Sequence, residues 1–232
     1  MFSNLFNYDN PFWRFMGKLW DLILLNILWI ICSIPVFTIG ATSTAVYYVT
    51  LKLVKDEEGA TIPSFFRSFR DNFKQATVLW LMLLVVVFVL VFDWRFALVA
   101  GGSAFAQIGM RAVFGCLSFV VLATVVYLFP LQARFYNPVK RTIINACLMA
   151  IRHFPKTIAM LVTDVGLVAV CVFVFPQAAI ILFLFGFPLF AFLNSYVLVT
   201  IFEKYMPKEG ESPEGEGIAR ESGGLDGSGA DG

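Results

Sequence analysis

The polar side chains that could do chemistry in this chain lie inside its most apolar stretches. Asp164 falls within the apolar run 157–175, where an acidic residue costs about 2.5 to 3.5 kcal/mol on membrane-insertion scales. Carboxylates in such places generally face a bundle interior or a cavity, where they handle protons or polar solutes. Asp164 is therefore the leading functional candidate. The competing hypothesis is a structural hydrogen bond to an Asn, Thr or Tyr of a neighbouring helix.

Hydroxylated residues gather at the start of the apolar segment 37–53. Small hydroxylated residues let helices approach closely and hydrogen-bond each other, so a packing face is one interpretation. The alternative is the wall of a polar cavity that asparagine and serine side chains from other segments also face, as a path for a sugar or another polar solute would require. Besides Asp164, the candidate intramembrane polar site comprises Asn26, Thr38, Thr42, Tyr47, Asn194 and Ser195.

Motifs of soluble catalysis are missing from the sequence. His153 is the one histidine, and no Gly-x-Ser-x-Gly, His-Glu-x-x-His or P-loop pattern occurs. The four cysteines are scattered through apolar surroundings without a Cys-x-x-Cys pair, which indicates neither a zinc site nor a redox dithiol. We expect no catalytic residue, no metal and no cofactor, and we expect that the protein is not an enzyme.

Membrane-spanning helices are the elements that must position the polar residues. The chain of 232 residues is 59% hydrophobic and 14% charged, whereas soluble domains usually carry about 25% charged residues. A helix of about 20 residues crosses a hydrocarbon core of about 30 Å. The sequence therefore predicts an all-α integral membrane protein. Apolar runs that could cross a bilayer fall at 19–51, 76–92, 112–131, 157–175 and 178–202.

The first of these runs is too long for one ordinary span. At about 1.5 Å per residue it would give roughly 50 Å of helix. Pro35 lies at its middle and Gly40 follows, and proline removes a backbone donor and disfavours helix at the residue before it. We expect a break near 33–40 that creates spans 19–34 and 37–53. The result is a bundle of six transmembrane helices, with five as the alternative.

The distribution of basic residues favours six spans. Cytoplasmic loops of membrane proteins are enriched in Lys and Arg. With six spans and the N-terminus inside, every basic residue except Arg95 and Arg111 lies on one side of the bilayer. Five spans would place basic segments on both sides. We expect a multi-pass protein of the cell membrane with both termini cytoplasmic.

Two cytoplasmic segments have the pattern of amphipathic helices. Asn137 and Pro138 mark a helix start for the second of them. The expected apolar stripes are Phe65, Phe66, Phe69 and Phe73 in the first, and Ile144, Cys147, Leu148, Ile151 and Phe154 in the second. A bilayer with anionic headgroups explains the neighbouring basic residues with fewer assumptions than nucleic acid does. The candidate lipid-binding or partner-binding residues are Arg67, Arg70, Lys74, Arg141 and Arg152.

The composition changes after the last apolar run. Residues 207–232 are rich in Gly, Glu, Ser and Asp and almost lack large apolar side chains, which is typical of disordered segments. We expect a transmembrane helical domain over 1–206 and a disordered acidic cytoplasmic tail over 207–232.

Several segments in combination carry a family resemblance. They are Asn26–Trp29, Pro35–Ala41, Phe66–Thr77, Tyr127–Phe135 and His153–Thr157. On these segments the chain resembles the YesL family of bacterial membrane proteins, whose activity is not established, over nearly everything from 5 to 205. The resemblance implies a protein that accompanies carbohydrate-uptake systems. It transfers no catalytic residue.

Two functions from different classes follow. The first is a permease-like or accessory component associated with carbohydrate uptake, whose bundle supplies a polar path or a docking surface. The second is a membrane-embedded sensor or scaffold that binds a regulatory partner through its cytoplasmic helices. Polar residues gathered on facing helices would favour the first, and polarity confined to the inner loops would favour the second.

Overall fold

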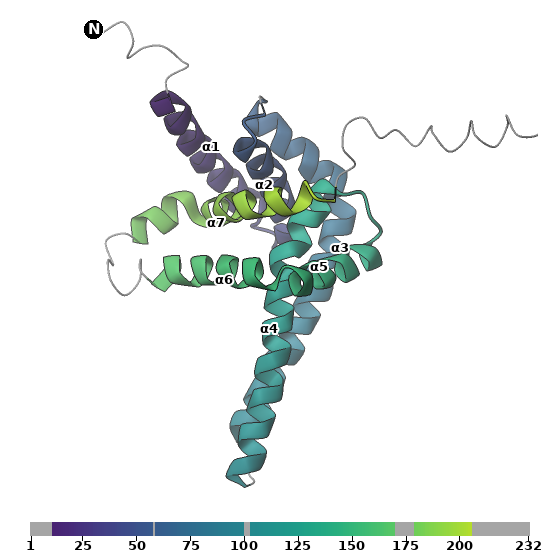
Figure 1. Cartoon of the computed structure of the whole chain (residues 1–232). Helices are drawn as coiled ribbons and strands as arrows, with labels where there is room; N and C mark the ends of the chain where they lie inside the picture. Colours follow the sequence, from purple (N-terminus) through teal and green to yellow (C-terminus); the bar gives the residue numbers. More distant parts are fainter. Residues whose placement is uncertain (1–10, 58, 100–102, 170–178, 206–232) are drawn as a thin grey trace, which may run out of the picture. The chain divides into compact units, whose positions relative to one another are not determined.

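The computed structural model describes residues 11–57, 59–99, 103–169 and 179–205, and their regular secondary structure is helical (Figure 1). The chain divides into two units, Met1–Val199 and Thr200–Gly232, and the contacts described below lie within the first. The expected tail, 207–232, lies outside the described residues. The helices are α1 (Pro11–Cys32), the 3-10 helix η1 (Val36–Thr38), α2 (Ile39–Val54), α3 (Thr61–Val99), α4 (Ala104–Arg134), α5 (Val139–Arg152), α6 (Phe154–Ala169) and α7 (Ala179–Phe202).

The break predicted near Pro35 is confirmed. α1 ends at Cys32, and η1 leads directly into α2. The Thr38 hydroxyl donates to the carbonyl of Cys32 at 2.5 Å and to that of Pro35 at 2.6 Å. The Pro35 carbonyl also accepts from the Thr38 backbone N–H at 2.9 Å. The Cys32 carbonyl lies where the α-helical ladder stops, so the Thr38 side chain satisfies an acceptor that the break leaves open.

Helix α2 is the most deeply buried element of the first unit. Every residue from Gly40 to Leu51 except Tyr48 is buried, and α2 contacts α1, α3 and α4. Gly40 lies directly against α3, because a Cβ at this position would overlap the Ala76 carbonyl oxygen and the Trp80 Cβ. The absent side chain therefore allows the two backbones to meet. We call α2 and the parts of α1, α3 and α4 that bury it the core.

Helix α3 corrects one expectation. The segment 65–74 is not a separate amphipathic helix, since Thr61–Val99 is one helix of 39 residues, about 58 Å long. No Pro or Gly interrupts it after Pro63 in its first turn. Its buried stripe also differs from the expected row of phenylalanines, because Phe66 is 47% exposed. The buried residues of this half are Thr61, Phe65, Ser68, Asn72, Ala76 and Leu79.

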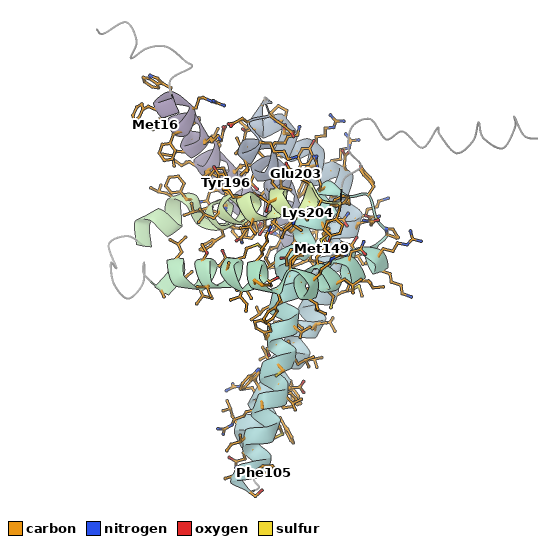
Figure 2. The ribbon with its side chains drawn as sticks, in the orientation of Figure 1. Met16, Phe105, Met149, Tyr196, Glu203 and Lys204 are labelled. Atoms are coloured by element: carbon orange, nitrogen blue, oxygen red, sulfur yellow. The ribbon has the colours of Figure 1, made fainter. Side chains whose placement is uncertain are left out.

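The second halves of α3 and α4 form a hairpin of two helices that lie side by side (Figure 1). We use the name hairpin for residues 81–99 of α3 and 104–122 of α4. The Trp94 indole donates to the Ser118 hydroxyl at 3.0 Å between them. Phe105 lies near the end of the hairpin and is 88% exposed (Figure 2). The expected outer loop, 93–111, is therefore mostly helix.

Helix α5 buries a face that the sequence pattern did not indicate. It starts after Pro138, as predicted, buries Thr142, Ala146 and Ala150, and contacts α4. The expected apolar stripe instead faces outward, since Leu148 and Ile151 are 58% and 66% exposed. Small side chains at the contact allow close approach between helices, which is a common device in membranes.

Four helices of the described residues are long and apolar enough to cross a membrane: Phe12–Cys32, Thr61–Val99, Ala104–Arg134 and Leu184–Phe202. They support a helical protein with several membrane spans. Two of the six expected spans are not among them. The segment 37–53 corresponds to α2, which has 16 residues and is buried, and the segment 157–175 extends past the described part of α6. The number six, and the alternative of five, remain predictions.

Candidate functional site

The site begins at a break in α7. Gly186 has a φ of 41° and a ψ of −137°, outside the helical region, and Pro188 follows within the same helix. Pro188 has no N–H, so the carbonyl four residues earlier loses its helical donor. That carbonyl belongs to Leu184, and the side-chain amide of Asn26 donates to it at 3.0 Å. Asn26 therefore satisfies the backbone acceptor that the proline leaves open.

Glycine is required at the break for two reasons. The positive φ at Gly186 is a conformation that other residues rarely adopt. In addition, a Cβ there would overlap the side-chain oxygen of Asn26. The break turns the chain next to Phe187, whose ring lies stacked on Trp29 with a centroid distance of 5.4 Å.

Asp164 on α6 is held by α7. The Asn194 amide nitrogen donates to both carboxylate oxygens, at 3.2 and 3.0 Å. Asn194 is 3% exposed, while Asp164 is half-buried. This contact with Asn194 is the hydrogen bond to a neighbouring helix that the structural hypothesis for Asp164 requires. The carboxylate also lines a cavity, as the functional hypothesis requires.

The cavity has a volume of about 800 Å³ and is bounded by residues of six helices. Polar groups are few in its wall, and they come from Ser43, Tyr47 and Asp164 together with the Trp29 indole, which donates to the Ser43 hydroxyl at 3.3 Å. Tyr47 interacts with Asn194 and with the Asp164 charge. The lining residues are Trp29, Ile39, Ser43, Tyr47, Trp80, Val125, Val126, Phe129, Asp164, Val165, Val168, Ala169, Phe187 and Phe190.

Aromatic rings supply much of the cavity wall. The Tyr47 ring meets Phe187 edge to face at 5.7 Å, and Trp80 lies 6.3 Å from Phe129. The Trp80 indole N–H donates to the Val36 carbonyl at 2.8 Å. Both cavity tryptophans therefore have their N–H groups occupied. What they offer to the cavity is ring surface.

The expected polar site is brought together only in part. Asp164, Tyr47 and Asn194 meet, and Asn26 lies at the break that precedes Phe187. Thr42 shares a 2.8 Å hydrogen bond with Ser33, and Ser195 shares one of 3.0 Å with Thr50. Neither these residues nor Thr38 line the cavity. They join helices, as the packing interpretation of the hydroxylated cluster proposed.

Sequence reasoning missed the aromatic half of the site. Trp29, Trp80 and Phe187 lie within apolar runs, and no role in a site was predicted for them. One signal was present: a buried tryptophan needs a partner for its N–H, so a tryptophan within an apolar run indicates a polar neighbour on another segment. That neighbour is Ser43 for Trp29 and a backbone carbonyl for Trp80.

A second buried polar network was also missed. The Gln132 amide donates to Asn72 at 3.2 Å and to Gln75 at 2.8 Å, and the Thr142 hydroxyl donates to the Gln132 carbonyl at 3.4 Å. Gln132 is 3% exposed. The network joins α3, α4 and α5 where α4 enters the core, and its groups largely satisfy one another. We assign it to packing.

The candidate lipid-binding residues lie at the surface. Arg67, Arg70, Lys74, Arg141 and Arg152 are all exposed. Arg67 lies 3.9 Å from Asp71. Arg70 and Lys74 line an open groove together with Asp71, Gln75 and the rings of Phe69, Phe73 and Tyr136. The geometry therefore presents the two cations of α3 beside aromatic rings.

An ion-pair cluster fastens α1 to the connection between α2 and α3. The Asp56 carboxylate lies 2.8 Å from Lys18 Nζ and 3.3 Å from an Arg14 nitrogen. The hydrogen bond from Lys18 holds the pKa of Asp56 below its ordinary value, and the Lys18 and Arg14 charges act in the same direction. Asp56 has a φ of 53°, a left-handed conformation that Asp and Asn tolerate better than most residues.

Within the described ranges, no group of three His, Cys, Asp or Glu side chains is placed to hold a metal ion. No curated protein and no solved structure matches the chain. Residues 22–94, which span α2, most of α3 and much of α1, match the model of one family, described as a protein of unknown function, DUF624. Over residues 22–94 the chain is therefore similar to DUF624 proteins, a family that includes YesL-like proteins.

Proposed function

We propose that this protein is a multi-pass membrane component that binds a small molecule in the Asp164 cavity and acts as a permease-like or accessory part of a carbohydrate-uptake system. One observation carries the binding function. An intramembrane carboxylate, oriented by a buried asparagine, lines a cavity of about 800 Å³. Ligand pockets typically have about 300 to 1,000 Å³, a mostly apolar wall and a few polar groups that orient the ligand.

The hydrogen bond from Asn194 supports positioning of the Asp164 carboxylate. A single amide that reaches both oxygens fixes the plane of the carboxylate. Because Asn194 is itself buried, its own rotation is restricted. Fixing a charged group in this way is typical of sites that recognise a ligand in one orientation. The link to carbohydrate uptake rests on the family resemblance alone.

Growth and uptake measurements test this function. Asp164→Asn keeps the size of the side chain and much of its hydrogen bonding but removes its charge. We expect unchanged expression and a lost growth or uptake phenotype in a strain that depends on this protein. The matched control is Asp93→Asn on α3, which should behave as wild type. Wild-type growth of Asp164→Asn, with Asp164→Leu impaired only through lower protein levels, would reject the proposal.

The second candidate is a sensor or scaffold that binds a regulatory partner. It is favoured by the exposed basic groove of Arg70 and Lys74 and by the exposed apolar face of α5. If anionic headgroups occupy the groove instead, each basic residue near the membrane surface contributes about 1 kcal/mol to the binding of anionic lipid. Replacing Arg67, Arg70 and Lys74 by Gln in the full chain should then reduce retention of anionic lipid in native mass spectra. Unchanged lipid retention would assign the groove to a protein partner.

Orientation in the cell membrane is part of the same proposal. With six spans and both termini cytoplasmic, a thiol reagent outside intact cells should label Gly102→Cys but not Ala60→Cys, in a background without the native cysteines. Labelling of Ala60→Cys from outside would contradict this topology. The same test at Gly210→Cys reports the side on which the C-terminal segment lies.

A further inference from the structure

We propose that the ligand of the Asp164 cavity is an organic cation with an apolar body, whose positive group lies beside the Asp164 carboxylate. The inference rests on the proposed binding function and names its ligand class. It follows from three properties of the wall: an uncompensated carboxylate, N–H donors that are already engaged, and aromatic faces. Each property is independent of the others.

The carboxylate has no cationic partner among the described residues. Ion pairs in that part of the chain include those of Asp56 with Arg14 and Lys18 and of Asp71 with Arg67. Asp164 is bonded instead by the amide of Asn194, which is neutral. Carboxylates inside membrane proteins are generally paired with a cation or with polar groups. Because a carboxylate accepts about four hydrogen bonds, Asp164 retains acceptor capacity for a positively charged group of the ligand.

The N–H donors around the cavity are committed to other acceptors. The Trp29 indole donates to Ser43, the Trp80 indole to the Val36 carbonyl, and the Asn194 amide to Asp164. A bound anion would find only the hydroxyl groups of Ser43 and Tyr47 as donors and would meet a negative charge. A carbohydrate needs many donors and acceptors at once, and this wall supplies few. The cavity is better suited to a ligand whose polar part is a single cationic group.

Aromatic faces supply the second attraction for a cation. A positive group within about 6 Å of a ring centroid is attracted by the ring quadrupole, and cages of such rings bind quaternary ammonium ligands. Phe187 stacks on Trp29 and meets Tyr47 edge to face, so the three rings support one another at the wall. The remaining wall is largely aliphatic, including Val125, Val126 and Val168, and fits an apolar body.

The test compares two probes of equal shape on the full chain in phosphatidylcholine nanodiscs. The first is phenethyltrimethylammonium, and the second is its uncharged isostere, in which carbon replaces the ammonium nitrogen. Calorimetry with empty discs as a blank gives both affinities. We expect the wild type to prefer the cation by about tenfold, equivalent to about 1.4 kcal/mol, and Asp164→Asn to lose the preference. Equal affinities in the wild type, or a preference that survives Asp164→Asn, would overturn the proposal.

A second variant keeps the test decisive if Asp164→Asn does not fold. Trp29→Leu removes one ring face, so it should weaken binding of the cation more than binding of the isostere. Equal weakening of both probes would remove the aromatic part of the argument.

Failure of the ligand class can be told apart from failure of the binding function. Val126→Trp places an indole ring at the cavity wall and should weaken binding of both probes. If the isostere binds the wild type as well as the cation does, and Val126→Trp weakens that binding, the binding function stands and the proposed ligand class is wrong. If neither probe binds the wild type, or if binding is indifferent to Val126→Trp, the proposals of the binding function and of the ligand class both fail.

Discussion

The same two helices, α3 and α4, are held in different ways in the core and in the hairpin. In the core, α3 buries Ser68 and Asn72, and α4 buries Gln132, and these side chains hydrogen-bond within and between helices. In the hairpin, apolar side chains such as Phe88 and Phe92 are 72% and 67% exposed. One hydrogen bond between side chains, from Trp94 to Ser118, is described there.

The difference shows which interactions determine the helices that pack against each other in this protein. Lipid tails solvate an apolar side chain about as well as another helix does, so apolar surface alone does not draw helices together in a membrane. Small residues and polar pairs do so, because they allow close approach and specific hydrogen bonds. The core contains both. The hairpin mainly presents apolar side chains, which lipid tails can cover.

The largest expected contrast comes from one methyl group placed in each region. Gly40→Ala puts a Cβ against the Ala76 carbonyl and Trp80 and should lower the free energy of unfolding by about 1 to 3 kcal/mol through overpacking. Gly115→Ala, in the hairpin helix α4, meets nothing within 4 Å and should gain about 0.5 to 1 kcal/mol of helix stability. Reversible unfolding in mixed micelles measures both. A shift of the same sign in the two variants would remove the distinction between core and hairpin.

The buried amide network should give the next largest effect. Gln132→Leu removes the donor that reaches the buried side-chain oxygen of Asn72, and an unsatisfied buried group costs about 1 to 3 kcal/mol. Unfolding of the variant should therefore occur at clearly lower denaturant. The control is Gln107→Leu, the same change in the hairpin part of α4, which we expect to stay within about 0.5 kcal/mol of the wild type. A neutral Gln132→Leu would mean that the network contributes no net stability.

A smaller effect is expected from the hairpin hydrogen bond. Ser118→Ala removes the acceptor of the Trp94 indole, and hydrogen bonds between membrane helices contribute about 0.6 kcal/mol on average. We expect a loss of this order and a change in Trp94 fluorescence, measured in a background without the other four tryptophans. A loss as large as that of Gln132→Leu would show that the hairpin depends on polar contacts as much as the core does.

The smallest effect concerns the Asp56 cluster at the rim of the core. The pKa of Asp56 is lower in the folded state than the ordinary value of 3.8. The stabilising contribution of its charge is therefore complete above pH 3.8 and is lost as the pH falls through the lowered pKa. Asp56→Asn keeps a residue that tolerates the positive φ. Thermal midpoints of the variant should fall slightly below those of the wild type at neutral pH. The two should converge at strongly acidic pH, and a constant difference across the acid range would contradict the role of this charge.

Local chemistry in the sequence accounts for the helical architecture. The length of the apolar runs predicts helices able to cross a membrane, and four such helices are present among the described residues. The break at Pro35 and the start of α5 after Pro138 follow from the missing proline N–H and from its fixed φ, which act within a few residues. Asp164 was likewise identified from the sequence alone, because it is an acidic residue within an apolar run.

Tertiary structure alone decided which faces are buried and what Asp164 meets. The row of phenylalanines in α3 and the apolar stripe of α5 were predicted to face the headgroup plane or the underside of the bundle. Of the row in α3, Phe65 is buried and Phe66 is exposed, and smaller or polar residues such as Ser68 and Ala146 are buried as well. An apolar stripe identifies the packed face when water is the alternative, but not when lipid is. Asn194 lies 30 residues from Asp164 in the chain, and the rings of the cavity come from separate helices. Their meeting depends on how α7 bends at Gly186 and Pro188, because that bend sets which side chains of α7 face α2 and α6.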